Sequence, residues 1–407
     1  MLGERIRRLR KQKKLTLEAL AGKQLTKGML SLIENNKAKP SMESLAYIAE
    51  KLEVEVSELL DEISIQELRE VLEKAEKLFN IEYEKRRDKY QQLTFLIEPY
   101  VSKLSQGYES ARLLEIYSRC LYHDKDEKWE DFSKRAAKLY NQMNLTANRA
   151  SVGIFHANVK LIERDYVQSL TIFLKERAEI ESTHAFIDPI TRLDLDYHEA
   201  ILYFAVGNVE TAIKVMENAI TFSKEKRIFY HIDDLYRLAA AHAMMSHNHG
   251  KKEYYLKKLA QYGEFTDNLD SLLFCELINI MTLIEEKHDY NMALTKIEHF
   301  FEDPKKVESF GPWFLLEKGK TLYFLERYDE ALLHLESIEI PDFIHHPFDL
   351  SIFYILDSYK ALCFLAKGDS ISAVSSAKIA LDNFAALPST PFKTFSIQTY
   401  DKILNSL

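Results

Sequence analysis

An internal repeat runs through most of this chain and restricts the folds that it can adopt. One position recurs at intervals of 37 to 43 residues. Small residues stand twelve places before it in six copies, aromatic residues three places before it in four, and glycine five places before it in three. The recurring positions are Phe132, Ser169, Ala212, Tyr255, Ala293, Ala331 and Ala373. Residue types that recur at fixed distances from one repeated position predict stacked helical hairpins. Each repeated position is then expected near the start of a hairpin's second helix.

The segment EAILYFAVGNVETAIKVMENAI shows the repeat most clearly, with Ala200, Gly207 and Ala212 at its marked positions. This segment resembles a tetratricopeptide repeat, in which small residues let two paired helices approach closely. The resemblance implies an all-α fold, a right-handed α-solenoid whose first helices line an inner groove. A degenerate helix pair is expected over residues 64–105 and a closing helix over Phe392–Leu404.

The first sixty residues follow a different pattern. Apolar residues recur there at helical spacing in five short groups. Thr16, Thr26 and Ser41 stand where N-caps belong, and Pro40 ends the loop before the fourth group. The pattern predicts five short helices, which together form a small domain.

This stretch, GERIRRLRKQKKLTLEALA…LTKGMLSLIENNKAKPSMESLAYIAEKLEVEVSELL, resembles the phage-repressor (Xre/Cro) type of helix-turn-helix domain. The resemblance implies that a reading helix, Thr26–Glu34, lies in the DNA major groove and that the following loop grips phosphates. It also implies an ion pair between Arg10 and Glu34. The DNA-contacting positions that it implies are Thr26, Lys27, Gly28, Met29, Ser31, Leu32, Asn35, Asn36, Lys37 and Lys39. Leu17 replaces the glutamine of many members, which removes one contact to DNA.

Two of these positions admit alternatives. Gly28 is either tolerated in an exposed first turn, or it lets the helix backbone approach the groove wall closely. Met29 either belongs to the domain core, which we favour, or contacts a thymine methyl group. A reading helix with so few hydrogen-bonding side chains suggests that DNA shape contributes to specificity.

Charge divides the chain in the same way. Residues 1–40 carry a balance of +8, and the rest must carry −17 because the whole chain carries −9. A basic amino-terminal domain (residues 1–61) on an acidic repeat domain (residues 62–407) suits a protein that touches nucleic acid with one end. No apolar run is long enough for a membrane span or signal peptide, and the three cysteines are scattered, so a cytoplasmic protein without a membrane is expected.

No motif for catalysis or cofactor binding is found. Gly319–Thr321 reads GKT, but Phe314 stands where a phosphate-binding loop needs glycine. His242, His247 and His249 lack a partner cluster for a metal. Neither an enzyme nor a cofactor or metal is expected.

The two-part architecture resembles the peptide-pheromone-sensing regulators of Gram-positive bacteria, the group that contains Rgg, PlcR, PrgX and NprR. The resemblance implies a quorum-sensing transcription regulator, a homodimer that binds double-stranded DNA and a short signalling peptide. Asn158 is the leading candidate to hold a peptide backbone, and Arg237 and Lys320 are candidates to hold its carboxylate. The inner-facing positions include Tyr117, Asn158, Tyr197, Arg237, Asn279, Thr282, Trp313, Lys320 and Tyr323. Two alternatives stay open, an adaptor that docks a response-regulator protein and a dimeric regulator that needs no ligand.

Overall fold

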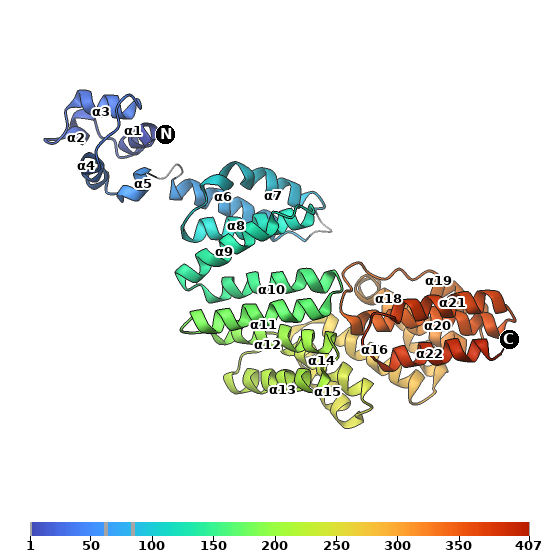
Figure 1. The fold of residues 1–407 in the computed structure, drawn as a ribbon. Helices are drawn as coiled ribbons and strands as arrows, with labels where there is room; N and C mark the ends of the chain where they lie inside the picture. Colours follow the sequence, from blue (N-terminus) through green and yellow to red (C-terminus); the bar gives the residue numbers. More distant parts are fainter. Residues whose placement is uncertain (1, 61–63, 83–85, 407) are drawn as a thin grey trace. The chain divides into compact units, whose positions relative to one another are not determined.

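The computed structural model describes residues 2–60, 64–82 and 86–406. The described residues form helices and loops without a strand, as the sequence predicts (Figure 1). By their contacts they separate into two units, Met1–Val152 and Gly153–Leu407. The predicted domain boundary between residues 61 and 62 lies outside the described residues and stays a prediction.

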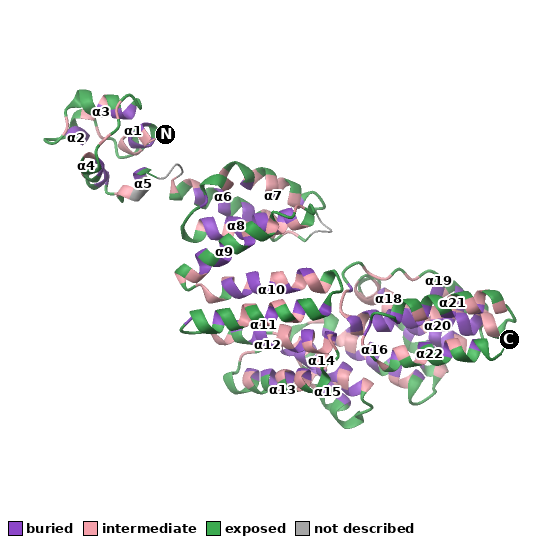
Figure 2. Ribbon diagram, in the orientation of Figure 1, coloured by how far each residue is buried: buried purple, intermediate pink, exposed green. Residues whose placement is uncertain are grey.

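The first unit begins with the five predicted short helices, which we call the head (residues 2–60). They are α1 (Leu2–Gln12), α2 (Leu17–Ala21), α3 (Lys27–Glu34), α4 (Met42–Leu52) and α5 (Val56–Leu60). Thr16, Thr26 and Ser41 cap α2, α3 and α4, each accepting a backbone N–H from three residues on, as predicted. Their apolar faces share one core, in which Ile6, Leu30 and other aliphatic side chains are buried (Figure 2).

The rest of the first unit has a core of its own. It comprises α6 (Ile65–Phe79), α7 (Lys89–Ile97), the 3-10 helix η1 (Glu98–Lys103), α8 (Gly107–His123) and α9 (Trp129–Met143). The expected degenerate pair over residues 64–105 is therefore confirmed. Glu115 is buried in α8 and accepts hydrogen bonds from Arg119 and from the Tyr140 hydroxyl, while pairing with Arg112 at 2.8 Å. These partners offset the cost of a buried carboxylate.

Stacked hairpins form the second unit, which we call the solenoid unit (residues 153–407). Its helices are α10 (Thr146–Ile162), which begins in the first unit, α11 (Tyr166–Thr183), α12 (Pro189–Ala205), α13 (Val209–Lys226), α14 (Ile232–Met245), α15 (His249–Thr266), α16 (Leu269–Glu285), α17 (Tyr290–Phe301), α18 (Pro304–Phe324), α19 (Tyr328–Glu336), α20 (Pro347–Ala366), α21 (Ser370–Phe384) and the closing α22 (Pro391–Leu404). All seven recurring sequence positions fall in odd-numbered helices from α9 to α21, as predicted for second helices.

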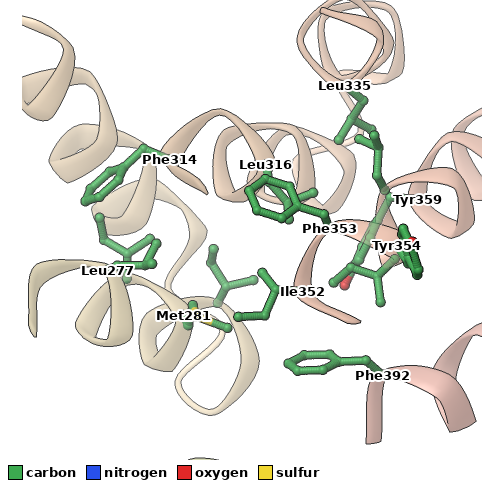
Figure 3. Close-up of a cluster of buried hydrophobic side chains, with 14 of the residues drawn as sticks. Leu277, Met281, Phe314, Leu316, Leu335, Ile352, Phe353, Tyr354, Tyr359 and Phe392 are labelled. Carbon is green, nitrogen blue, oxygen red and sulfur yellow. The ribbon is translucent and has the colours of Figure 1, made fainter. Parts of the chain in front are cut away.

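Small buried residues allow the helices of each hairpin to approach. Ala200 of α12 and Ala212 of α13 are both fully buried, and α12 packs against α13. Each even-numbered helix from α12 to α20 also packs against the next even-numbered one, so the first helices stand beside one another. The largest core lies at the carboxyl-terminal end of the unit, where Phe314, Phe353 and Tyr359 are buried among aliphatic side chains (Figure 3).

The loop before α20 connects the two ends of the solenoid unit. His346 approaches the carbonyl oxygen of Ile201 in α12 at 3.2 Å, and the Tyr166 hydroxyl donates to the carbonyl oxygen of His345 at 3.1 Å. The Arg164 guanidinium donates to the Tyr354 hydroxyl at 2.8 Å. These contacts join residues more than 140 positions apart, so the row of first helices curves back on itself.

Gly3 marks the closest approach of α1 to α3. A Cβ atom there would lie 2.0 Å from the carbonyl oxygen of Ile33 and 2.8 Å from the Glu34 backbone. Gly3→Ala is therefore expected to push α1 away from α3 and to lower the free energy of unfolding by about 1–3 kcal/mol. Chemical denaturation of the full chain measures this loss. Gly107→Ala is unsuitable as a control, because the φ of Gly107 is +81° and a side chain there would strain the backbone. Gly28→Ala is the control, because a Cβ atom at Gly28 would meet open space.

Candidate functional site

The exposed edge of α3 is the first candidate surface. Lys27, Gly28, Met29 and Leu32 are exposed, whereas Leu30, Ile33 and Glu34 on the opposite side are buried. The exposed fraction is 49% for Met29 and 46% for Leu32, so the favoured placement of Met29 in the core is wrong. Helical geometry explains the result, because Leu30 and Ile33 share a face that Met29 and Leu32 do not. Two apolar side chains therefore face solvent on a helix that the head presents.

Arg10 and Glu34 hold α3 in place. The Arg10 guanidinium donates to both carboxylate oxygens of Glu34, at 2.7 and 2.8 Å, and to the carbonyl oxygen of Leu15 at 2.9 Å. Glu34 is buried, and its hydrogen bonds raise the pKa of Arg10. The predicted ion pair is confirmed, and its bidentate geometry fixes the angle between α1 and α3.

Some basic residues of the head form contacts within the head itself. Arg5 is buried and donates to the carbonyl oxygen of Leu59 at 2.7 Å. Lys27 pairs with Glu18 at 2.6 Å, although both side chains stay largely exposed. Arg7, Arg8 and Lys11 of α1 are exposed beside Glu4 and Gln12. The predicted excess of positive charge is thus only partly available to a ligand.

The loop after α3 carries the remaining predicted DNA contacts. Asn35, Asn36, Lys37 and Lys39 are all exposed. Asn36 has a positive φ of 57°, and its side-chain oxygen accepts the backbone N–H of Gly3 at 2.9 Å. Asn35 donates to the carbonyl oxygen of Ser31 at 2.8 Å. The two asparagines therefore shape the loop, and the two lysines extend from it. Thr26 and the partly buried Ser31 complete the predicted set, Thr26 as the N-cap of α3.

A cavity of about 540 Å³ in the solenoid unit is the second candidate site. It takes residues from five consecutive first helices, α12, α14, α16, α18 and α20, and from the loop before α20. Phe274, Phe310, Trp313 and Phe348 give it an aromatic wall. Aliphatic residues such as Leu277 and Ile352, which belong to the buried core drawn in Figure 3, complete the lining. A cavity of this volume and composition is within the range of ligand-binding pockets.

Arg237 of α14 is the one cationic side chain that the described structure places in the cavity wall. Its guanidinium donates to Asp234 at 2.6 Å and to Asp233 at 3.1 Å. Its Nε atom is buried and has no hydrogen-bond partner in the structure. Because two carboxylates already offset its charge, Arg237 presents no free positive charge to a ligand.

His231 lies outside the cavity lining and contacts Asp234, the aspartate that pairs with Arg237. It contacts Asp194 at 3.1 Å and Asp234 at 2.8 Å, and its ring stacks on Tyr197 with 4.5 Å between centroids. Burial disfavours the charged imidazole, but the hydrogen bonds to the two aspartates prevail and raise the pKa of His231 to about 9. The charged form therefore stabilises the fold below pH 6.5, and this contribution is lost as the pH rises through about 9.

Only some of the predicted inner-facing positions lie in the cavity. Tyr197, Arg237 and Trp313 line it. Asn158 lies on α10, partly buried and outside the lining, and Tyr117 is buried in the first unit. Tyr323 packs its ring against Tyr359 in the core beyond the cavity.

Asn279 and Thr282 miss the cavity because the expected phase of α16 is wrong by one residue. The lining uses Leu277, Ile278 and Met281, which share one face. Asn279 is exposed instead, and Thr282 accepts a hydrogen bond from Lys252 at 3.1 Å.

Lys320 is a structural residue rather than a ligand for a peptide carboxylate. Its side chain is 0% exposed, and its ammonium lies 2.9 Å from both Glu317 and Glu285. Burial of the pair excludes an outside carboxylate. The GKT segment that contains Lys320 lies inside α18, so it forms no phosphate-binding loop.

Other residues that the sequence did not indicate also line the cavity, above all Phe274, Phe310 and Asp349. Spacings of three and four residues along the first helices, such as Phe310 to Trp313 and Phe274 to Ile278, carry this signal. This spacing pattern can be recognised only when it is known which face of each helix is buried.

Residues 3–65 match a family model described as a helix-turn-helix domain. The head has the helix-turn-helix arrangement. In it α2 and α3 are the two helices of the motif, Gly22 with its φ of 52° ends α2, and α3 presents the exposed edge. No curated protein sequence matches the chain.

Solved structures that are similar to the chain at low identity include the following three regulators. PlcR of Bacillus thuringiensis, in complex with the peptide PapR7 and DNA, is 19% identical over 72% of this chain and 98% of its own, with a TM-score of 0.33. The apo form of the competence regulator ComR from Streptococcus vestibularis is 17% identical over 63% and 89%, with a TM-score of 0.32. The SHP pheromone receptor Rgg2 of Streptococcus dysgalactiae is 17% identical over 67% and 97%, with a TM-score of 0.30.

Among the described residues, no group of three or more histidine, cysteine, aspartate or glutamate side chains is placed to hold a metal ion. Within the same residues, every helix is too short or too polar to span a membrane. The three cysteines are buried and unpaired, as core thiols are.

Proposed function

We propose that the protein is a sequence-specific DNA-binding transcription regulator whose activity is controlled by a short peptide bound in the solenoid unit. The observation that carries the proposal is the cavity formed by five consecutive first helices in a chain whose amino-terminal end matches a helix-turn-helix domain. Because each first helix belongs to a different hairpin, a ligand that touches all five changes how the hairpins stack.

The head supports DNA binding through α3 and the loop that follows. Met29 and Leu32 supply exposed apolar contacts of the kind that pack on thymine methyl groups, and Lys37 and Lys39 supply phosphate contacts. Two heads of a homodimer meet half-sites about 34 Å or a multiple apart, so a change in the solenoid unit alters their fit to DNA. The protein acts without catalysis in this function.

A blocked cavity tests the proposal. Ser309 lies at the cavity wall and donates to Asp270, and both residues contact solvent. Ser309→Trp is expected to fill the cavity without disturbing the core, whereas Ser337→Trp on an exposed surface serves as the matched control. We expect a pool of random synthetic heptapeptides to change the DNA affinity of the unaltered protein and of the control at least tenfold, but not that of Ser309→Trp.

Two other outcomes of these binding experiments would favour the alternative functions. Equal DNA binding with and without peptide, in all three proteins, contradicts peptide control and favours the regulator that needs no ligand. Capture of a purified response regulator by a chain that does not bind DNA favours the adaptor.

A substitution at Gly28 distinguishes the two roles considered for this glycine. Either it is tolerated in an exposed first turn, or it lets the α3 backbone approach DNA closely. A Cβ atom at Gly28 would meet no other atom within 4 Å, so the fold of the head does not require glycine there. Gly28→Ala is expected to leave stability unchanged or raise it by up to about 1 kcal/mol. If the α3 backbone lies against the groove wall, DNA affinity falls about tenfold, the equivalent of 1.4 kcal/mol. Fluorescence anisotropy with labelled duplex measures affinity, and equal affinity shows that the glycine is merely tolerated.

A further inference from the structure

Asp349 is an acidic side chain in the cavity wall that the fold leaves without a partner. It is the third residue of α20 and lines the cavity together with Phe348 and Ile352. Among the described residues, none donates a hydrogen bond to its carboxylate or forms an ion pair with it. Burial accordingly raises the pKa of Asp349. A partly buried carboxylate without a partner is costly for the protein and is a common feature of binding sites.

The two nearest basic side chains are engaged elsewhere. Arg237 donates to Asp233 and Asp234. His346 accepts the backbone N–H of Phe348 on Nδ1 and directs Nε2 toward the carbonyl oxygen of Ile201, which is the pattern of a neutral imidazole. Burial also lowers the pKa of His346. Among the described residues, the fold therefore supplies no cation that pairs directly with Asp349, and the charge of Arg237 opposes the effect of burial only in part.

The cavity lining as a whole contains more acidic than basic side chains. Asp234 is already paired with Arg237, which leaves Asp349 and the Ser309-bonded Asp270 as the other acidic groups of the lining, while the rest is mostly aromatic and aliphatic. A ligand that complements this wall is apolar and carries a positive charge near Asp349. An acidic peptide, by contrast, would place another carboxylate beside Asp349.

We propose that Asp349 binds a cationic group of the ligand, a lysine or arginine side chain or a free amino terminus, beside apolar residues. This inference rests on the proposed function, since it names the chemistry of the peptide that the cavity accepts. It makes Asp349 the residue that determines which peptides bind.

Four pools of synthetic heptapeptides built from leucine, isoleucine, valine and phenylalanine test the inference. Three pools have blocked termini and carry lysine, norleucine or glutamate at the central position, and the fourth has a free amino terminus and no lysine. Equilibrium dialysis against the purified full chain measures binding. The proteins compared are the unaltered chain, Asp349→Asn and the matched control Asp342→Asn, which alters an exposed aspartate of the loop before α20.

We expect the lysine pool or the free-amine pool to bind the unaltered chain and Asp342→Asn at least tenfold more tightly than the norleucine and glutamate pools. The identity of the preferred pool shows which cationic group is used. Asp349→Asn is expected to lose this preference while still binding norleucine peptides, and Asp349→Lys is expected to prefer glutamate. Binding of all pools with equal affinity overturns the role of Asp349 and leaves peptide control intact. Binding of none of them overturns both.

Discussion

Raising the salt concentration from about 50 to about 200 mM is expected to weaken DNA binding about a hundredfold for each head bound. Arg7, Arg8, Lys37 and Lys39 are exposed on α1 and on the loop after α3, and each phosphate contact that they make releases counterions from DNA. Because this electrostatic contribution does not depend on sequence, a mixed-sequence duplex suffices as the probe. Fluorescence anisotropy at several salt concentrations gives the slope.

The slope identifies the residues responsible. Replacing Lys37 and Lys39 together by glutamine is expected to reduce it by about 2, because each lost phosphate contact reduces it by about 1. Lys287→Gln, on an exposed surface of the solenoid unit, is the control and should leave the slope unchanged. Affinity that does not vary with salt would contradict DNA binding by the head.

Lys320→Met is expected to lower the free energy of unfolding by about 3–5 kcal/mol, because it leaves the buried Glu317 carboxylate without its partner. Glu317 is 1% exposed and Lys320 is 0% exposed, so water does not replace the lost ion pair. The other partner, Glu285, is 40% exposed and remains hydrated. The double variant Lys320→Met/Glu317→Leu removes both buried charges and should recover most of the loss.

The loss should also depend on pH. Burial raises the pKa of Glu317 to about 7, even though Lys320 acts against the shift. Without Lys320 this pKa rises further, and the neutral carboxyl group is tolerated below pH 4.5, the usual pKa of a glutamate. Because Glu317 of the unaltered protein also gains its proton below about pH 7, the deficit of Lys320→Met is smallest below that pH and grows as the pH rises from about 7 to 8. Chemical denaturation at several pH values checks this, and a deficit that is constant with pH would place the cost elsewhere.

The repeat and the helix starts could be predicted from the sequence because they depend on local rules. Thr16, Thr26 and Ser41 cap their helices whatever packs around them. Ala200 and Ala212 mark a close helix pair because a larger side chain would keep the helices apart. The pair Arg10–Glu34 followed from the resemblance of the head to a known domain type, and the structure confirms it.

The phase of the first helices could not be predicted in this way. A shift of one residue along α16 turns the expected position by about 100°, which exchanges Ile278 in the cavity for Asn279 in solvent. Similarly, Met29 and Leu30 are both apolar neighbours, and only packing against the rest of the head decides which is buried.

By itself, the sequence determined the helical class, the hairpin repeat, the helix caps and the basic head, since each depends on residues close together in the chain. Tertiary structure decided that Lys320 is paired inside the core, that Asp349 faces the cavity without a partner, and that the loop at His346 returns to α12. The contact of His346 with α12 joins residues 145 positions apart. The physical reason is that burial and charge pairing depend on which helices meet, and helices of one repeat type look alike until they are packed.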